Sequence, residues 1–114
     1  MSSMINLSVL QNNDAKINLY VTYQPENLWI PLPLTGITPS FVLKASQTAT
    51  DASGTTYTVG NGLTILSSRL GQIQASIPKT SLATAGSMWY RLDLTSAANG
   101  DQTAIYGNLY ILAA

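Results

Sequence analysis

Apolar and polar residues alternate with a period of two along most of this chain, a pattern typical of β-strands with one buried face. The first such segment has Ile5, Leu7 and Val9 as its apolar positions and ends at the turn residues Asn12 and Asn13. From the same pattern we expect seven to eight short strands, drawn from residues 5–10, 16–23, 41–45, 55–59, 63–66, 72–77, 88–95 and 104–112.

Turn-forming residues separate these segments. Two prolines and a glycine interrupt residues 28–38, so we expect this apolar stretch to follow a sheet edge without forming a regular ladder. Residues 47–54 are small and polar, which predicts a loop or hairpin tip. Residues 81–85 are the best candidate for a helical turn, with Gly86 as its stop.

This arrangement predicts an all-β fold. Short strands at a spacing of roughly 8–12 residues are typical of an antiparallel β-sandwich or barrel. The predicted strands differ in length and one helical turn lies between late strands, which favours the sandwich over an up-and-down barrel. A chain of 114 residues fits a single domain, and we assign residues 1–114 to it.

The composition leaves few groups for catalysis. Histidine and cysteine are both absent, which excludes disulfides, imidazole bases, thiolate nucleophiles and zinc sites built on those ligands. Four of the five carboxylates fall in or beside turns, where aspartate bonds to the backbone. We therefore expect no enzyme activity, no cofactor and no metal site; the carboxylates are Asp14, Glu26, Asp51, Asp93 and Asp101.

Charge is low and balanced. Charged residues make up 9% of the chain and the formal net charge is zero, whereas a typical globular domain is about 25% charged. The five basic residues are scattered, so we expect no nucleic-acid binding. Low charge fits a chain that works inside an assembly, but abundant serine, threonine, asparagine and glutamine could also supply solubility.

The chain is expected to be made in the cytoplasm and not to bind or span membranes. No stretch approaches the ~20 apolar residues of a membrane helix. The opening Met1-Ser2-Ser3-Met4 lacks the basic start and apolar run of a signal peptide.

Aromatic residues are the best candidates for a binding surface. If the apolar positions of each strand face inward, four aromatic residues face outward: Tyr20, Trp89, Tyr106 and Tyr110. Tyrosine and tryptophan are enriched at interfaces because they bury much area and keep a polar tip. Outward aromatic residues also occur in ordinary cross-strand pairs. Trp29 lies beside the loop prolines, where it either caps the core or projects as an anchor.

Several short motifs along the chain point to a known family. They are Leu34-Thr35-Gly36, Lys44, Tyr90-Arg91-Leu92-Asp93-Leu94 and Gly107-Asn108-Leu109-Tyr110-Ile111. In these motifs the chain resembles the small immunoglobulin-like β-sandwich proteins of tailed bacteriophages, and it is similar to the amino-terminal domain of phage upper baseplate proteins. The resemblance covers nearly the whole chain.

The resemblance implies an immunoglobulin-like sandwich in a virion structural protein, and it brings no catalytic residues. Such a protein would dock in several copies, on itself and on other virion proteins, as a tail, baseplate or fibre-linking component. Two alternatives stay open at this point. One is a capsid decoration protein with the same sandwich, and the other is a carbohydrate-binding module that stacks exposed aromatic residues on sugar rings.

Overall fold

Most of the alternating segments form β-strands in the computed structural model, which describes residues 3–23, 30–31, 34, 36–69, 71–97 and 100–113. The strands are β1 (Ser3–Met4), β2 (Leu7–Leu10), β3 (Ala15–Tyr20), β4 (Thr22–Tyr23), β5 (Ile30–Pro31), β6 (Ile37–Lys44), β7 (Thr55–Val59), β8 (Gly62–Ser67), β9 (Gln72–Ile77), β10 (Gly86–Ser96) and β11 (Gly100–Leu112), with short 3₁₀ helices η2 (Asp51–Ser53) and η3 (Lys79–Leu82).

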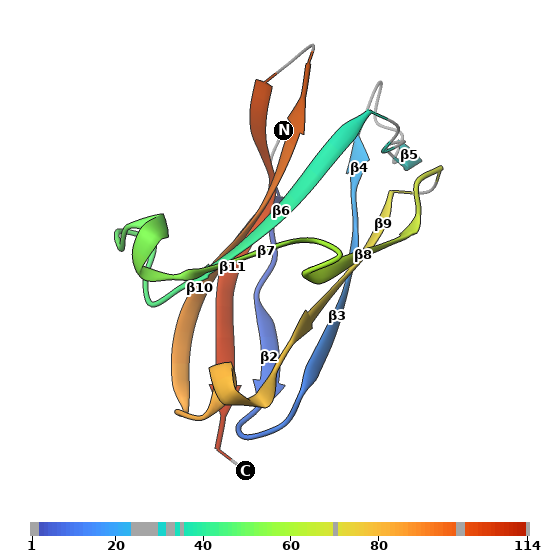
Figure 1. The fold of residues 1–114 in the computed structure, drawn as a ribbon. Helices are drawn as coiled ribbons and strands as arrows, with labels where there is room; N and C mark the ends of the chain where they lie inside the picture. Colours follow the sequence, from blue (N-terminus) through green and yellow to red (C-terminus); the bar gives the residue numbers. More distant parts are fainter. Residues whose placement is uncertain are drawn as a thin grey trace.

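The strands pack as two layers (Figure 1). One layer has the order β2–β11–β10–β6–β7, with β1 also on β11, and the other has the order β8–β9–β3. The β7–β8 connection passes from one layer to the other, and a short parallel pairing there makes the hydrogen-bonded path continuous.

The chain order within these layers resembles that of a variable-type immunoglobulin domain, with no strand in the place of C″ among the described residues. Strands β3, β9 and β8 take the places of strands B, E and D, while β6, β7, β10 and β11 take those of C, C′, F and G. The helix η3 connects β9 to β10. The predicted all-β sandwich is therefore confirmed, and its strand order agrees with an immunoglobulin-like arrangement.

Several details differ from the sequence-based expectation. Eleven strands are described instead of seven to eight, because residues 16–23 divide into β3 and β4, and β1 and β5 are additional. Strands β1 and β2 pair with β11 in parallel, as do β7 and β8 with each other, because alternation identifies a strand's faces but not its direction. The helical turn begins at Lys79, whose backbone N–H donates to Asp14 Oδ1 at 2.7 Å. The turn covers residues 79–82 instead of 81–85, and Gly86 begins β10.

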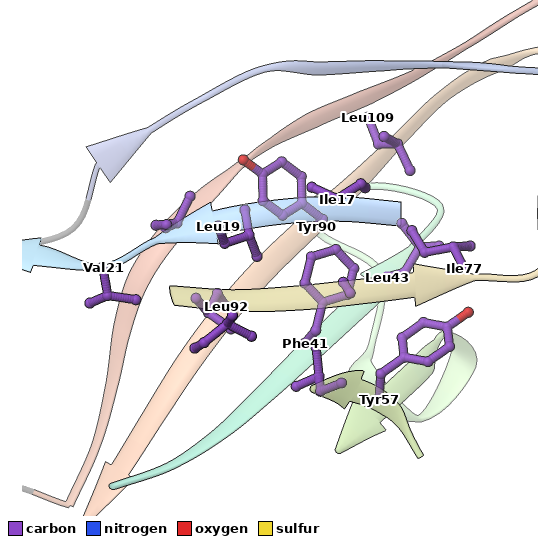
Figure 2. Packing of buried hydrophobic residues seen from close by; sticks show 14 of the residues in the cluster. Ile17, Leu19, Val21, Phe41, Leu43, Tyr57, Ile77, Tyr90, Leu92 and Leu109 are labelled. Atoms are coloured by element: carbon purple, nitrogen blue, oxygen red, sulfur yellow. The ribbon is translucent and has the colours of Figure 1, made fainter. Parts of the chain in front are cut away.

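The core lies between the layers and consists of the inward positions of the alternating strands. Phe41 of β6 and Tyr90 of β10 stack with ring centroids 5.5 Å apart. Figure 2 shows these two rings beside Ile17 and Leu19 of β3, from the opposite layer. A single apolar cluster thus joins both layers.

One core hydroxyl is unpaired. Tyr57 Oη is buried and has no hydrogen-bond partner among the described residues. Replacing Tyr57 with phenylalanine removes only this group, so we expect the free energy of unfolding to rise by about 1 kcal/mol, because burying an unbonded hydroxyl is unfavourable. Urea denaturation of both proteins measures the difference.

Tyr90→Phe is the matched control. The Tyr90 hydroxyl donates to the backbone carbonyl of Ile5, and burial raises the pKa of Tyr90 to about 12. Loss of the Tyr90 hydroxyl leaves that carbonyl without this hydrogen bond, so this variant should be less stable by about 1–2 kcal/mol. A loss of stability in Tyr57→Phe as large as that in Tyr90→Phe would mean that Tyr57 also holds a bonded partner, such as a water molecule.

Candidate interaction face

The outer face of the β3–β9 pair is polar. Asn18 accepts a hydrogen bond from Gln74 Nε2 at 3.0 Å across the β3–β9 pair. Tyr20 projects from this face with 57% of its surface exposed and pairs with Gln72. Tyr20 is thus a single aromatic residue on a hydrogen-bonded face and lies on the opposite layer from Trp89, Tyr106 and Tyr110.

The outer face of the β2–β11–β10–β6 layer carries an exposed apolar strip. We define the apolar strip as four side chains whose exposed fractions are 39% or more: Met4, Leu10, Tyr110 and Leu112. Leu10 is the register partner of Leu112, and Met4 that of Tyr106. Because register partners on neighbouring strands point to the same side of a sheet, these residues share one face.

Uncharged polar residues accompany the apolar strip. Asn6, Ser8 and Ser87 are exposed, and Asn108 is half-buried. Ser8 and Ser87 are the partners of Tyr110 on its two sides, in β2 and β10. The Asn6 side chain accepts a hydrogen bond from the Asn108 backbone N–H at 3.0 Å. No charged residue therefore interrupts the described part of the strip.

A hollow of about 340 Å³ lies on the same layer, next to the strip. It is lined by Lys44, Gln47, Trp89, Arg91, Thr103 and Tyr106. The Trp89 and Tyr106 rings pack with centroids 5.5 Å apart. Trp89 faces outward, as the alternation predicts, but only 9% of its surface is exposed, so it forms the floor of the hollow.

Charged side chains on this hollow are paired with one another. Arg91 donates from Nε to Asp93 at 2.7 Å and from Nη2 to Asp51 at 2.7 Å. Lys44, which is buried, donates from Nζ to Asp51 at 3.0 Å and to the Ala49 carbonyl at 2.9 Å. These bonds fasten the 45–54 loop over the outer face of β6.

The same contacts perturb the aspartate. Hydrogen bonds from Arg91, then from Lys44, lower the pKa of Asp51 to about 2. Asp51 therefore stays ionised at any pH near neutrality, and its loop stays tied to β10.

The predicted aromatic residues thus fall into separate environments. Tyr110 belongs to the apolar strip, Trp89 and Tyr106 form the hollow, and Tyr20 lies on the other layer. Trp29 lies outside the described residues.

Three apolar members of the strip were missed by the sequence analysis: Met4, Leu10 and Leu112. The available signal was the loss of alternation at two strand ends, where Val9-Leu10 and Ile111-Leu112 place apolar residues on both faces. Such a doublet puts an apolar side chain on the outer face.

The described part of the chain contains neither a cluster of metal ligands nor a membrane-spanning helix. Within it, no three His, Cys, Asp or Glu residues gather as metal ligands. No described helix is long and apolar enough to cross a membrane. In the comparisons with known proteins, no family model matches the chain and no curated protein is detectably similar to it in sequence.

Proposed function

We propose that this protein is a non-enzymatic structural component of a bacteriophage virion, docking in several copies at the tail, the baseplate or a fibre junction. The observation that carries the proposal is the apolar strip on the β2–β11–β10–β6 layer. The resemblance of the sequence to phage immunoglobulin-like proteins supplies the virion setting.

The strip is suited to a protein contact. Exposed apolar side chains flanked by uncharged polar residues are typical of interaction surfaces. Leu10, Tyr110 and Leu112 lie together at one end of this face, and Asn6 and Ser8 separate them from Met4. Met4, Leu10 and Leu112 each expose half or more of their surface, and an aliphatic side chain gains about 1.5–3 kcal/mol on full burial. The polar groups beside the strip are uncharged, so a contact here buries no unpaired ion.

The balance of charge supports repeated copies. With five acidic and five basic residues, neighbouring copies have no net repulsion to overcome. On the same layer, Lys44 and Arg91 form ion pairs with Asp51 and Asp93, so these four charges balance one another.

Association through the strip is testable in solution. The protein should increase in mass with concentration from micromolar to millimolar, measured by sedimentation equilibrium. Leu112→Ser should weaken association at least tenfold, because its burial at the contact is lost. Tyr20→Ser is the matched control: it removes an exposed side chain from the polar face of the β3–β9 pair and should leave association unchanged.

The virion setting needs a separate measurement. Particles purified from a lysate of cells that carry the gene should contain the protein in many copies by quantitative mass spectrometry. The Leu112→Ser protein should be depleted from those particles, and the Tyr20→Ser protein should not. A strict monomer that is also absent from particles would contradict the proposal.

A further inference from the structure

We propose that the hollow lined by Trp89, Tyr106, Gln47 and Arg91 is a binding site for a neutral saccharide. The site lies on the same outer face as the apolar strip but is formed by different residues. The inference does not rest on the proposed virion function.

The size and lining of the hollow suit one small ligand. Its volume of about 340 Å³ is at the lower end of the range for small-molecule sites, about 300–1,000 Å³. One wall is aromatic: Tyr106 is partly exposed and rests on Trp89, with ring centroids 5.5 Å apart. A ring held in this way offers a fixed apolar surface for the C–H face of a sugar.

Charge selects against ionic ligands. The two cations of the site, Lys44 and Arg91, are matched by the carboxylates of Asp51 and Asp93. An anion that reached Arg91 would also meet both carboxylates, and a cation that reached those carboxylates would meet Lys44 and Arg91. The site is neutral as a whole and favours an uncharged polar molecule.

Both donors and acceptors remain available in the hollow. Arg91 Nη1 and Nη2 each direct one N–H to Asp51, which leaves a second N–H on each nitrogen. Thr103 Oγ1 donates to Asp93 at 2.8 Å and keeps its lone pairs as acceptors. A sugar hydroxyl both donates and accepts, so this mixture matches a polyol better than an apolar ligand.

Gln47 supplies the adaptable part of the site. Its side chain is exposed, and no hydrogen bond from it to another described residue is present. The amide offers two donor hydrogens and a carbonyl acceptor beside the aromatic wall. The opposite wall is rigid because Arg91 is bonded to two carboxylates, which reduces the entropy lost on binding.

The direct test is a nuclear magnetic resonance titration of the ¹⁵N-labelled protein with D-glucose, D-galactose and N-acetyl-D-glucosamine. At least one sugar should give saturable shifts with a millimolar dissociation constant, at the Trp89 indole N–H and the Gln47 amide. Gln47→Ala and Thr103→Val should each weaken that binding by roughly 2- to 12-fold, the loss of one hydrogen bond. Gln74→Ala, on the polar face of the β3–β9 pair, should not change it.

Charged analogues test the ligand class. Glucuronate and glucosamine should bind more weakly than the neutral sugar that binds best, and tighter binding of either would overturn the assignment to neutral saccharides. The absence of saturable shifts for all three neutral sugars, or shifts away from the hollow, would overturn the site. Leu112→Ser should leave the titration unchanged, so failure of this inference and failure of the proposed assembly are distinguishable.

Discussion

Replacing Gly107 with alanine is expected to lower the free energy of unfolding by about 3 kcal/mol. A Cβ atom at this position would overlap the backbone carbonyl oxygen of Ile5 and lie 2.8 Å from its carbon. A backbone group cannot rotate away as a flexible side chain does. The segment between β1 and β2 would therefore have to move off β11.

Moving that segment breaks a set of contacts that hold the amino-terminal strands. Ile5 N–H donates to the Tyr106 carbonyl at 2.8 Å, and the Ile5 carbonyl accepts from the Tyr90 hydroxyl. The hydrogen bond from the Asn108 backbone N–H to the Asn6 side chain is lost with them. Because Met4 and Leu10 belong to these strands, self-association through the apolar strip should weaken together with stability.

Urea denaturation measures the stability change in Gly107→Ala, and amide hydrogen exchange locates it. Exchange should increase first at Ile5 and along β2. Gly60→Ala is the control, since Gly60 has a positive φ of 84° but a Cβ added there would meet no atom within 4 Å, and strained backbone alone costs about 1 kcal/mol. Equal losses in the two variants would show that the close approach to Ile5 is not a constraint.

The buried face of each strand was predictable because it depends on local order alone. Ile17 and Leu19, or Tyr90 and Leu92, are two residues apart and must share a face of an extended strand. The structure places all four in the core. The predicted outward direction of Tyr20 and Tyr110 follows from the same rule.

What covers an outward residue depends on distant segments and was not predictable. Trp89 faces away from the core, yet it is nearly buried, because Tyr106 packs on it and Lys44 is its partner on β6. The alternation of β10 contains no information about either neighbour. An outward position is therefore not the same as an exposed one.

The hollow was hidden from the sequence for a related reason. Its polar wall depends on Asp51 reaching Arg91, a pair 40 residues apart. Residues 47–54 have the composition of an ordinary polar loop, and only the fold shows that this loop lies over the outer face of β6. Conversely, Arg91 and Asp93 are neighbours on one face of one strand, and that half of the network was visible from spacing alone.

Replacing Phe41 with alanine is expected to cost about 3–5 kcal/mol, the largest loss of stability predicted for this protein. Phe41 is fully buried. Its ring stacks on that of Tyr90, with centroids 5.5 Å apart, and its centroid lies 6.1 Å from that of the Tyr57 ring. Its removal leaves a cavity in the one apolar cluster that joins both layers. Since the free energy of unfolding of a typical domain is about 5–15 kcal/mol, the variant would keep only part of its stability.

The pattern of loss should differ from that in Gly107→Ala. Hydrogen exchange in Phe41→Ala should increase in both layers, including β3 and β9, because the cavity weakens the shared core. Phe41→Leu is the matched control: it keeps most of the volume and should cost about 1 kcal/mol. Equal destabilisation by leucine and alanine would mean that the aromatic stack, and not the filled volume, holds the layers together. Faster hydrogen exchange confined to β6 and β10 would mean that the layers are stabilised separately.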